Sequence, residues 1–563
     1  MASDKLLSLF ATCAIQSGWR LNTITVLSGA ASALAFAPFH FSVILFITLP
    51  TLIFCANPDR HKCLHGFHKN AFSTVFFLKP ILSWKHLRHG FVVGWWFGFG
   101  FHLAGLYWIS GALLVQQELF AWLIPFAITI IPAGLALFFG LATSLLACMS
   151  GPAVARVLIL VLTLSAAEWL RGHVMTGFPW NTLGYALAHP LIFLQFVSVI
   201  GIYGVTAVTV CVFSAPLPIM LEAVQLKQKR GVLKPIILLT SVPLVIMAIY
   251  GGYCLIQPQP SLVPDVKLRL VQPSIKQRDK FDTSKRAEIL ALLLKLSGIK
   301  PALTDRRDKG ITHIIWPEAA VAFRTPNNTE LFTSLSRALP DKTTLIAGTL
   351  RLDNQNTVNL NKQNILNSAV VINDDGKVIA SYDKIHLVPF GEYLPFQNWL
   401  EAAGLEQLTR VKGGLTSGST LQPLVSIPGI PYARILICYE IIFPNDIISG
   451  SKRPSVLINL TNDAWYGLST GPYQHFHQSV VRAVEQGVPL IRVGNNGISA
   501  VVDGRGRIIS KLNLNDVGVL DTRLPKPIPT TIYSHFGDII FAVIWFFLFF
   551  ILFIKVRLQS NRD

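Results

Sequence analysis

Three side chains of types that cooperate in covalent catalysis each follow an apolar or extended run of the sequence. The run His-Ile-Ile-Trp-Pro ends at the carboxylate of Glu318, Val-Ile-Ala-Ser-Tyr-Asp ends at the amine of Lys384, and Arg-Ile-Leu-Ile ends at the thiol of Cys438. Functional side chains of α/β proteins gather at the carboxyl ends of strands. We therefore expect these three residues to lie close together.

A carboxylate, an amine and a thiol are together able to carry out nucleophilic acyl chemistry. A cysteine thiol with an ordinary pKa is mostly protonated at neutral pH and needs a base. Glu318 is the candidate base, provided that its site is dry. Lys384 and the backbone N–H of Tyr439 are candidates to stabilise the oxyanion of a tetrahedral intermediate. Taken alone, such a cysteine is more often a small core residue, and such a lysine and glutamate most often form a solvated pair.

The composition indicates that these residues belong to a membrane protein. Of 563 residues, 52% are hydrophobic and only 14% are charged, against about 25% charged in ordinary soluble domains. This excludes a disordered chain and an ordinary soluble protein. Eight apolar runs are candidates to span a membrane: 22–39, 41–56, 90–110, 120–148, 152–170, 191–221, 235–256 and 538–556.

The formal net charge of +18 fits a membrane topology. Lys and Arg gather in the segments that lie inside if the N-terminus is cytoplasmic, whereas the short outside loops hold only Arg171. This positive-inside pattern predicts cytoplasmic termini and places residues 257–537 outside. We therefore expect no nucleic-acid partner.

We predict three parts: a membrane domain of seven spans over 1–256, an α/β domain over 257–537, and an eighth span with a cytoplasmic tail over 538–563. The α/β domain alternates strand-like and helical runs. Only Cys438 of the seven cysteines lies in it, so no disulfide framework is expected there. The strand-like runs are 267–271, 313–316, 344–348, 369–372, 378–382, 434–437, 456–460, 490–493, 499–502 and 518–520, and the helical ones are 283–298, 328–338 and 472–486.

Longer strings of sequence carry a family resemblance. Trp-Pro-Glu318, Asp-Lys384-Ile-His-Leu-Val-Pro-Phe-Gly-Glu392-Tyr-Leu-Pro and Cys438-Tyr-Glu resemble the nitrilase superfamily. Further strings are similar to one branch of it, the bacterial apolipoprotein N-acyltransferases. These strings are Glu168-Trp-Leu-Arg-Gly172, Gly177-Phe-Pro-Trp180, Asn462-Asp-Ala-Trp-Tyr-Gly467, Gly471-Pro-Tyr-Gln-His475 and Asn495-Asn-Gly497.

The resemblance implies an αββα sandwich at the outer face of a bacterial inner membrane, with a ping-pong acyl transfer. Cys438 would take the sn-1 acyl chain of a membrane phospholipid as a thioester. The α-amine of a diacylglyceryl-cysteine at the N-terminus of an apolipoprotein would then accept it. Glu318 would be the base and Lys384 the oxyanion stabiliser, supported by Glu392, Tyr439 and Glu440. We expect a monomer that needs no cofactor and no metal.

Four residues are candidates for contact with substrate. Phe281 stands where relatives often have Trp, and Trp465 and Tyr393 lie in aromatic loops that either reach the membrane interface or simply pack. Arg171 either meets a lipid phosphate or anchors its helix end. The His- and Cys-rich stretch 61–68 fits no standard zinc spacing, and we interpret it as a basic interfacial loop.

Two other functions use the same features. A membrane-anchored hydrolase would use the same three residues with water as acyl acceptor. A non-enzymatic transporter with an external receptor domain is less consistent with the sequence, because Glu168 is the only acidic residue inside the proposed spans away from an end.

Overall fold

The computed structural model describes residues 16–58, 79–80, 83–225, 233–280, 282–298, 310–321, 335, 339–352, 364–409, 411, 413–447 and 452–560. The chain forms two compact units. Unit 1 comprises Met1–Ile109, Leu123–Gln257 and His535–Asp563, and unit 2 comprises Ser110–Trp122 and Pro258–Ser534. Residues 110–122, which lie between two apolar runs of the sequence, thus belong to the same unit as the α/β sheets.

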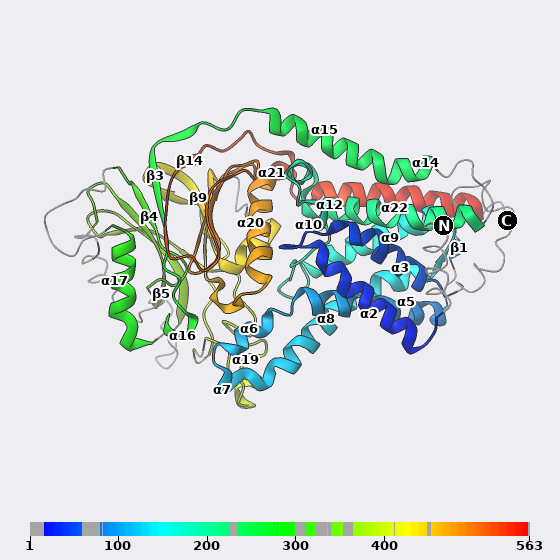
Figure 1. The fold of residues 1–563 in the computed structure, drawn as a ribbon, viewed down its shortest axis with the longest axis horizontal. Coiled ribbons are helices and arrows are strands. Elements are labelled where there is room, and N and C mark those ends of the chain that lie inside the picture. The colour runs from blue at the N-terminus through cyan, green and yellow to red at the C-terminus, as the bar shows by residue number, and fades with distance from the viewer. Residues whose placement is uncertain are drawn as a thin grey trace. The chain divides into compact units, whose positions relative to one another are not determined.

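Unit 1 is helical, and each of the eight apolar runs contains a helix (Figure 1). Within the described residues, four helical segments are long and apolar enough to cross a membrane: Gln117–Ala147, Ala153–Arg171, Val197–Glu222 and Leu233–Ile256. The helix Val197–Ser214 ends before Pro216, where a second helix begins, whereas the helix Ile124–Ala147 continues through Pro132. The main helices are α2 (Trp19–Ser32), α3 (Leu45–Cys55), α5 (Trp84–Gly105), α8 (Ile124–Ala147), α9 (Ala153–Arg171), α12 (Val197–Ser214), α13 (Pro216–Gln225), α14 (Leu233–Ile236), α15 (Val242–Ile256) and α22 (Ile539–Ser560).

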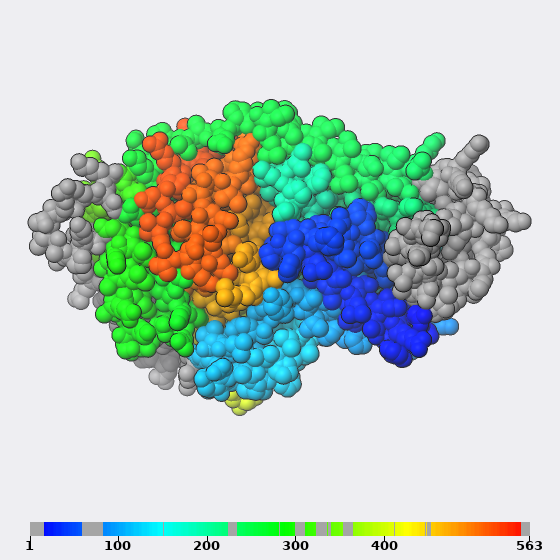
Figure 2. Space-filling model, in the orientation of Figure 1, coloured from blue at the N-terminus to red at the C-terminus, as the bar shows by residue number. Residues whose placement is uncertain are grey.

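Glycines allow α2 and α5 to approach closely. A Cβ on Gly29 of α2 would lie 1.9 Å from the backbone oxygen of Phe97, and one on Gly100 of α5 would lie 2.0 Å from that of Val26. Small residues at such crossings are typical of helices that pack in a membrane. α2 also forms part of the surface of unit 1 (Figure 2), and Trp19 at its start is exposed.

Unit 2 is built on two six-stranded sheets, ordered β14-β3-β4-β5-β6-β7 and β13-β12-β11-β10-β9-β8. The central strands β3, β4 and β5 run parallel, as do β9, β10 and β11, and the flanking pairs are antiparallel. The strands are β3 (Leu262–Gln272), β4 (His313–Ile315), β5 (Thr344–Leu352), β6 (Ile365–Ile372), β7 (Val378–Asp383), β8 (Val425–Ile427), β9 (Ile430–Ile437), β10 (Val456–Thr461), β11 (Leu490–Gly494), β12 (Ser499–Val502), β13 (Ile508–Leu512) and β14 (Gly518–Pro525).

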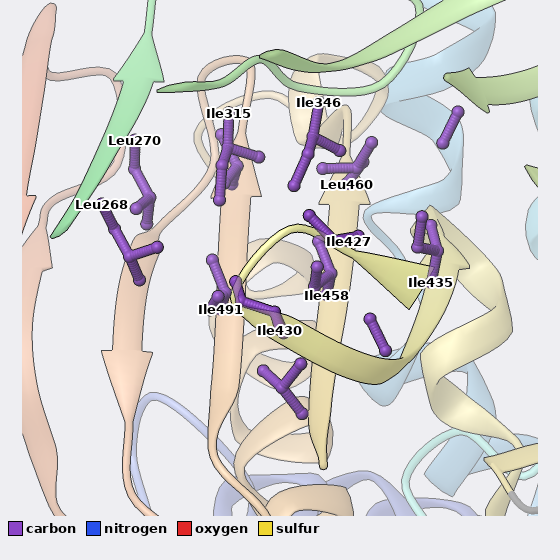
Figure 3. Packing of buried hydrophobic residues seen from close by; sticks show 14 of the residues in the cluster. Leu268, Leu270, Ile315, Ile346, Ile427, Ile430, Ile435, Ile458, Leu460 and Ile491 are labelled. Carbon is purple, nitrogen blue, oxygen red and sulfur yellow. The ribbon is translucent and has the colours of Figure 1, made fainter. Parts of the chain in front are cut away.

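The two sheets face each other across an apolar core. Because side chains alternate along a strand, β4 directs Ile315 into this core while Ile314 and Trp316 face the opposite side. Figure 3 shows side chains of the first sheet meeting those of the second, including Leu268, Leu270, Ile315, Ile346, Ile435, Ile458, Leu460 and Ile491.

Helices cover the outer faces and complete four layers. α17 (Arg286–Leu296) packs Ile289 and Leu293 against the outer side of the first sheet. α20 (Gly471–Gln486) packs on β11 of the second sheet, so the order of layers is αββα (Figure 1). The predicted strands all overlap observed ones, and the fold class of this unit is that expected. β8 and β13 were not predicted, and the expected helix 328–338 lies almost entirely outside the described residues.

Gly348 of β5 generates a prediction about packing. A Cβ there would lie 2.4 Å from the backbone oxygen of Pro317 and 2.7 Å from Cα of Glu318. Gly348→Ala should therefore lower the free energy of unfolding by about 1–3 kcal/mol, measured by thermal unfolding in detergent. Gly518→Ala is the matched control, because a Cβ on this strand glycine meets nothing within 4 Å. Equal melting temperatures for the two variants would contradict the prediction.

Candidate active site

Glu318, Lys384 and Cys438 lie in one cavity of unit 2. Glu318 follows β4, Lys384 follows β7 and Cys438 follows β9, so each side chain emerges where a strand ends. The cavity has a volume of about 110 Å³. Its polar lining residues are Gln277, Glu318, Asn367, Lys384, Glu392, Thr409, Cys438 and Asn462, and apolar side chains including Ala112, Leu350, Leu415 and Trp465 form much of the remainder.

The ammonium group of Lys384 is held between two carboxylates. Its Nζ lies 2.9 Å from Oε1 of Glu392 and 3.4 Å from Oε1 of Glu318, and the side chain is 1% exposed. Burial alone would lower the pKa of Lys384, but the two carboxylates outweigh it and raise the pKa above the ordinary value. The charged form of Lys384 is therefore favoured inside the cavity.

Asn367 of β6 organises the same group of charges. Its Nδ2 donates to Oε1 of Glu318 at 2.8 Å and to Oε1 of Glu392 at 3.0 Å, and its backbone oxygen accepts from the N–H of Lys384 at 2.8 Å. Val388 N–H donates to the other oxygen of Glu392. Sequence reasoning missed Asn367, because an asparagine inside an apolar strand run carries no motif in a single sequence.

Cys438 occupies a strained position at the start of a 3-10 turn (Cys438–Ile442). Its φ of 52° lies in the left-handed region, which costs about 1–3 kcal/mol for a residue with a side chain. The Cys438 backbone oxygen accepts from Nε2 of His475 at 3.1 Å and from Nδ2 of Asn459 at 3.3 Å. These two bonds fix the turn that presents the thiol.

His475, which bonds to this turn, belongs to a buried ionic network. Nδ1 of His475 lies 2.9 Å from Asp463, and Nη2 of Arg492 lies 2.8 Å from the other carboxylate oxygen. Burial raises the pKa of Asp463, but the charges of Arg492 and His475 outweigh it and hold that pKa below its usual range. Sγ of Cys438 and the donor atoms of His475 and Asp463 lie within 4.8 Å of one another, a spacing suited to a metal ion. Both carboxylate oxygens of Asp463 are already paired, which is typical of a hydrogen-bond network.

Glu440 ties the nucleophile turn to the loop that carries Lys384. Its Oε1 accepts from the backbone N–H groups of Ile385 at 2.7 Å and His386 at 3.1 Å, and its Oε2 accepts from the N–H of Ile437 at 2.7 Å. The carboxylate therefore fixes the two segments to each other. Tyr439, the next residue along the turn, is buried and packs edge-on against Phe443.

Lys280 is a second buried amine beside the site, and sequence reasoning assigned it no role. Its Nζ donates to the backbone oxygen of Glu318 at 2.6 Å. Burial lowers its pKa to about 8. The contact holds the main chain of the candidate base in place.

The remaining predicted substrate-contacting residues occupy different places. Trp465 lines the cavity, and Tyr393 is half-buried and is not among the lining residues. Arg171 is buried in unit 1, where it pairs with Glu168 at 2.6 Å and donates to the backbone oxygens of Phe178 and Trp180. Phe281 and the stretch 61–68 lie outside the described residues.

Comparison with known proteins matches both parts of the chain. Residues 267–527 match the family model for carbon-nitrogen hydrolase, and residues 28–215 match that for the apolipoprotein N-acyltransferase N-terminal domain. An amidase structure from Nesterenkonia sp. aligns with 47% of this chain and 92% of its own, at 17% identity and a TM-score of 0.32. A carbon-nitrogen hydrolase structure from Helicobacter pylori aligns with 46% of this chain and 88% of its own, at 15% identity and a TM-score of 0.33.

Unit 2 is thus a carbon-nitrogen hydrolase domain, which is the class that the paired sheets and the family model define. Relatives that align over nearly the whole chain identify one family within this class. The apolipoprotein N-acyltransferase of Rhodopseudomonas palustris is 40% identical and covers 94% of both chains, and that of Bradyrhizobium diazoefficiens is 39% identical over 94% of this chain and 93% of its own. The Brucella suis enzyme is 37% identical over 91% of each chain. The chain belongs to the apolipoprotein N-acyltransferase family.

The environment of Cys438 predicts an unusual pH dependence. Burial, followed by the nearby Glu318 carboxylate, raises the thiol pKa to about 12, against about 8.5 for a free thiol. A raised thiol pKa favours the neutral form, so alkylation of Cys438 by iodoacetamide should keep rising up to about pH 10. A cysteine in a short unstructured peptide with both ends blocked, in the same samples, should level off as its own thiol ionises at about pH 8.5. Mass spectrometry of the Cys438 peptide measures this rate, and a plateau near pH 8.5 would contradict the prediction.

Proposed function

We propose that this protein transfers the sn-1 acyl chain of a membrane phospholipid, through a thioester on Cys438, to the α-amine of an N-terminal diacylglyceryl-cysteine on apolipoproteins. The observation that carries the proposal is the shared cavity of a buried thiol whose neutral form is favoured, a carboxylate and an ammonium group. These are the parts that acyl transfer through a covalent intermediate requires. The names of the full-length relatives support the choice of substrates.

In the first step, Glu318 accepts the proton of the Cys438 thiol as sulfur bonds to the ester carbonyl carbon. Lys384 donates a hydrogen bond to the developing oxyanion, and its fixed position means that little reorganisation is needed. The ester C–O bond then breaks. The departing glycerol oxygen takes the proton from Glu318, which leaves a thioester and a lysophospholipid.

In the second step, the α-amine of the acceptor attacks the thioester carbonyl. Glu318 takes a proton from the attacking nitrogen, and Lys384 again stabilises the oxyanion. The C–S bond breaks, the sulfur recovers the proton, and an amide-linked acyl chain leaves with the lipoprotein. Glu392 and Asn367 keep Lys384 and Glu318 in the same positions through both steps.

The proposal also includes the location of the protein. We place eight spans in a bacterial inner membrane, unit 2 on the periplasmic side and both termini in the cytoplasm. Exposed apolar side chains of unit 2 support contact with lipid, since Phe396 and Leu468 are 82% and 85% exposed and Trp399, in the short helix α19 (Gln397–Ala402), is 82% exposed. In the sequence, these residues follow closely after the cavity-lining residues 391–392 and 465–466.

The experiment that tests this function follows an acyl chain. Purified protein in detergent is incubated with a phospholipid labelled in its sn-1 acyl chain, and mass spectrometry locates the label. We expect label on Cys438, its absence in Cys438→Ala, and its retention in Cys148→Ala, which removes a buried cysteine of unit 1. Glu318→Gln should block thioester formation itself, because the neutral thiol then has no base. Label in Cys438→Ala, or none in the wild type, would overturn the proposal.

Adding a diacylglyceryl peptide with a free N-terminus separates a transferase from a hydrolase. A transferase moves the label to the peptide as an amide. Release of the label only as free fatty acid would instead identify a membrane-anchored hydrolase with water as the acceptor.

A further inference from the structure

Three amide side chains form a hydrogen-bonded chain that ends at the catalytic cavity. Asn495 Nδ2 donates to Oδ1 of Asn462 at 3.0 Å, and Asn462 Nδ2 donates to Oε1 of Gln277 at 2.6 Å. The three side chains are buried, at 0%, 3% and 6% exposure respectively. Asn462 and Gln277 both line the cavity that holds Cys438.

The main chain of Ile275 fixes the direction of this chain of amides. The N–H of Ile275 donates to Oδ1 of Asn495 at 3.1 Å, while Nδ2 of Asn495 donates back to the oxygen of Ile275 at 2.7 Å. A backbone N–H can only donate, so the oxygen of Asn495 must face it. Each following amide must then present its oxygen to the preceding nitrogen. The orientation of Gln277 is therefore set, with its nitrogen at the far end.

The nitrogen of Gln277 is the terminal group of this chain. Among the residues that the structure describes, Nε2 of Gln277 has no hydrogen-bond partner, although it is fully buried. An unpaired buried donor costs about 1–3 kcal/mol. A ligand that accepts its hydrogen bond would remove this cost. The cavity wall at Gln277 is thus preset to bind an acceptor and to disfavour a donor.

The charges of the cavity indicate which acceptor fits. The charged lining residues are Lys384, Glu318 and Glu392, which is one cation against two carboxylates. A phosphate would meet a net negative lining and, at Gln277, only a neutral donor. A carbonyl oxygen carries no net charge and matches a single N–H donor.

The sheet order indicates which carbonyl this is. Gln277 follows β3, whereas Lys384 follows β7, and β4, β5 and β6 lie between these strands. The two side chains therefore reach the cavity from opposite sides. The oxygen of the reacting carbonyl belongs beside Lys384, so Gln277 faces another part of the lipid.

We infer that Gln277 is a substrate-orienting donor that binds the ester carbonyl oxygen of an acyl chain that is not transferred. The inference rests on the proposed function. Both substrates of that function carry such an ester on glycerol, in the phospholipid donor and in the diacylglyceryl acceptor. Binding this second ester would align the reacting group with the thiol, and would favour diacyl lipids over lipids with an ether-linked chain.

The test compares wild type with Gln277→Met, which keeps the length of the side chain and removes the donor together with the oxygen that accepts from Asn462. Acyl-enzyme formation is timed with a diacyl phospholipid and with one whose sn-2 chain is ether-linked. Transfer from preformed acyl-enzyme is timed with a diacylglyceryl peptide and with its dialkyl analogue. We expect Gln277→Met to slow one half-reaction by about 10- to 100-fold with the ester substrate. With the matching ether substrate, wild type should be as slow as the variant.

Gln272 provides the matched control on β3. Its Nε2 donates to the backbone oxygens of Asn513 and Asp516, and its Oε1 accepts from Ser499. Gln272→Met removes an equally buried amide that does not line the cavity. It should lower the melting temperature and leave both half-reactions of the folded protein unchanged.

The outcomes separate the alternatives. Slowing of acyl-enzyme formation alone assigns the carbonyl to the phospholipid, and slowing of transfer alone assigns it to the acceptor. A Gln277→Met protein as fast as wild type, or slowed equally with ester and ether substrates, would overturn the inference while leaving the proposed function intact. A wild type that forms no acyl-enzyme would instead overturn the proposed function.

Discussion

The ammonium group of Lys384, enclosed between the carboxylates of Glu318 and Glu392, is the interaction on which the site depends. Removing an ion from water costs several kcal/mol, and here two carboxylates and the bridging amide of Asn367 offset that cost. Removal of one partner from a buried ion pair typically costs about 3–5 kcal/mol. The same arrangement places a fixed positive charge beside a thiol that is itself neutral. The contacts that hold Lys384 in the fold are therefore the same contacts that place its charge beside the thiol.

The paired sheets explain how these groups meet. Glu318 and Lys384 follow strands of one sheet, and Cys438 follows a strand of the other. The αββα core fixes the two sheets face to face, so strand ends from both reach a single cavity. The nucleophile turn is strained, because the backbone of Cys438 is left-handed, and His475 and Asn459 hold it through its carbonyl oxygen. Glu440 then links this turn to the Lys384 loop by accepting backbone hydrogen bonds from both.

The sequence predicted the features that depend on local pattern. Runs of β-branched residues located most of the strands, and the reactive residues at the ends of such runs lie in one cavity. It did not predict β8, because a strand of three residues is too short for a clear alternation of buried and exposed side chains. Nor did it identify Asn367, Lys280 and Asn459, because their importance comes from partners more than 20 residues away. The assignment of residues 110–122 to unit 2 has the same origin: only the folded chain brings Ala112 to the cavity.

In the proposed reaction, the acyl group rests on Cys438 with its carbonyl oxygen held by Lys384. An experimental structure of the acyl-enzyme, formed with phospholipid and without acceptor, measures this directly. We expect continuous density from Sγ of Cys438 into the acyl chain, with the thioester oxygen within hydrogen-bond distance of Lys384 Nζ. An acyl chain on another residue, or a thioester oxygen directed away from Lys384, would contradict it.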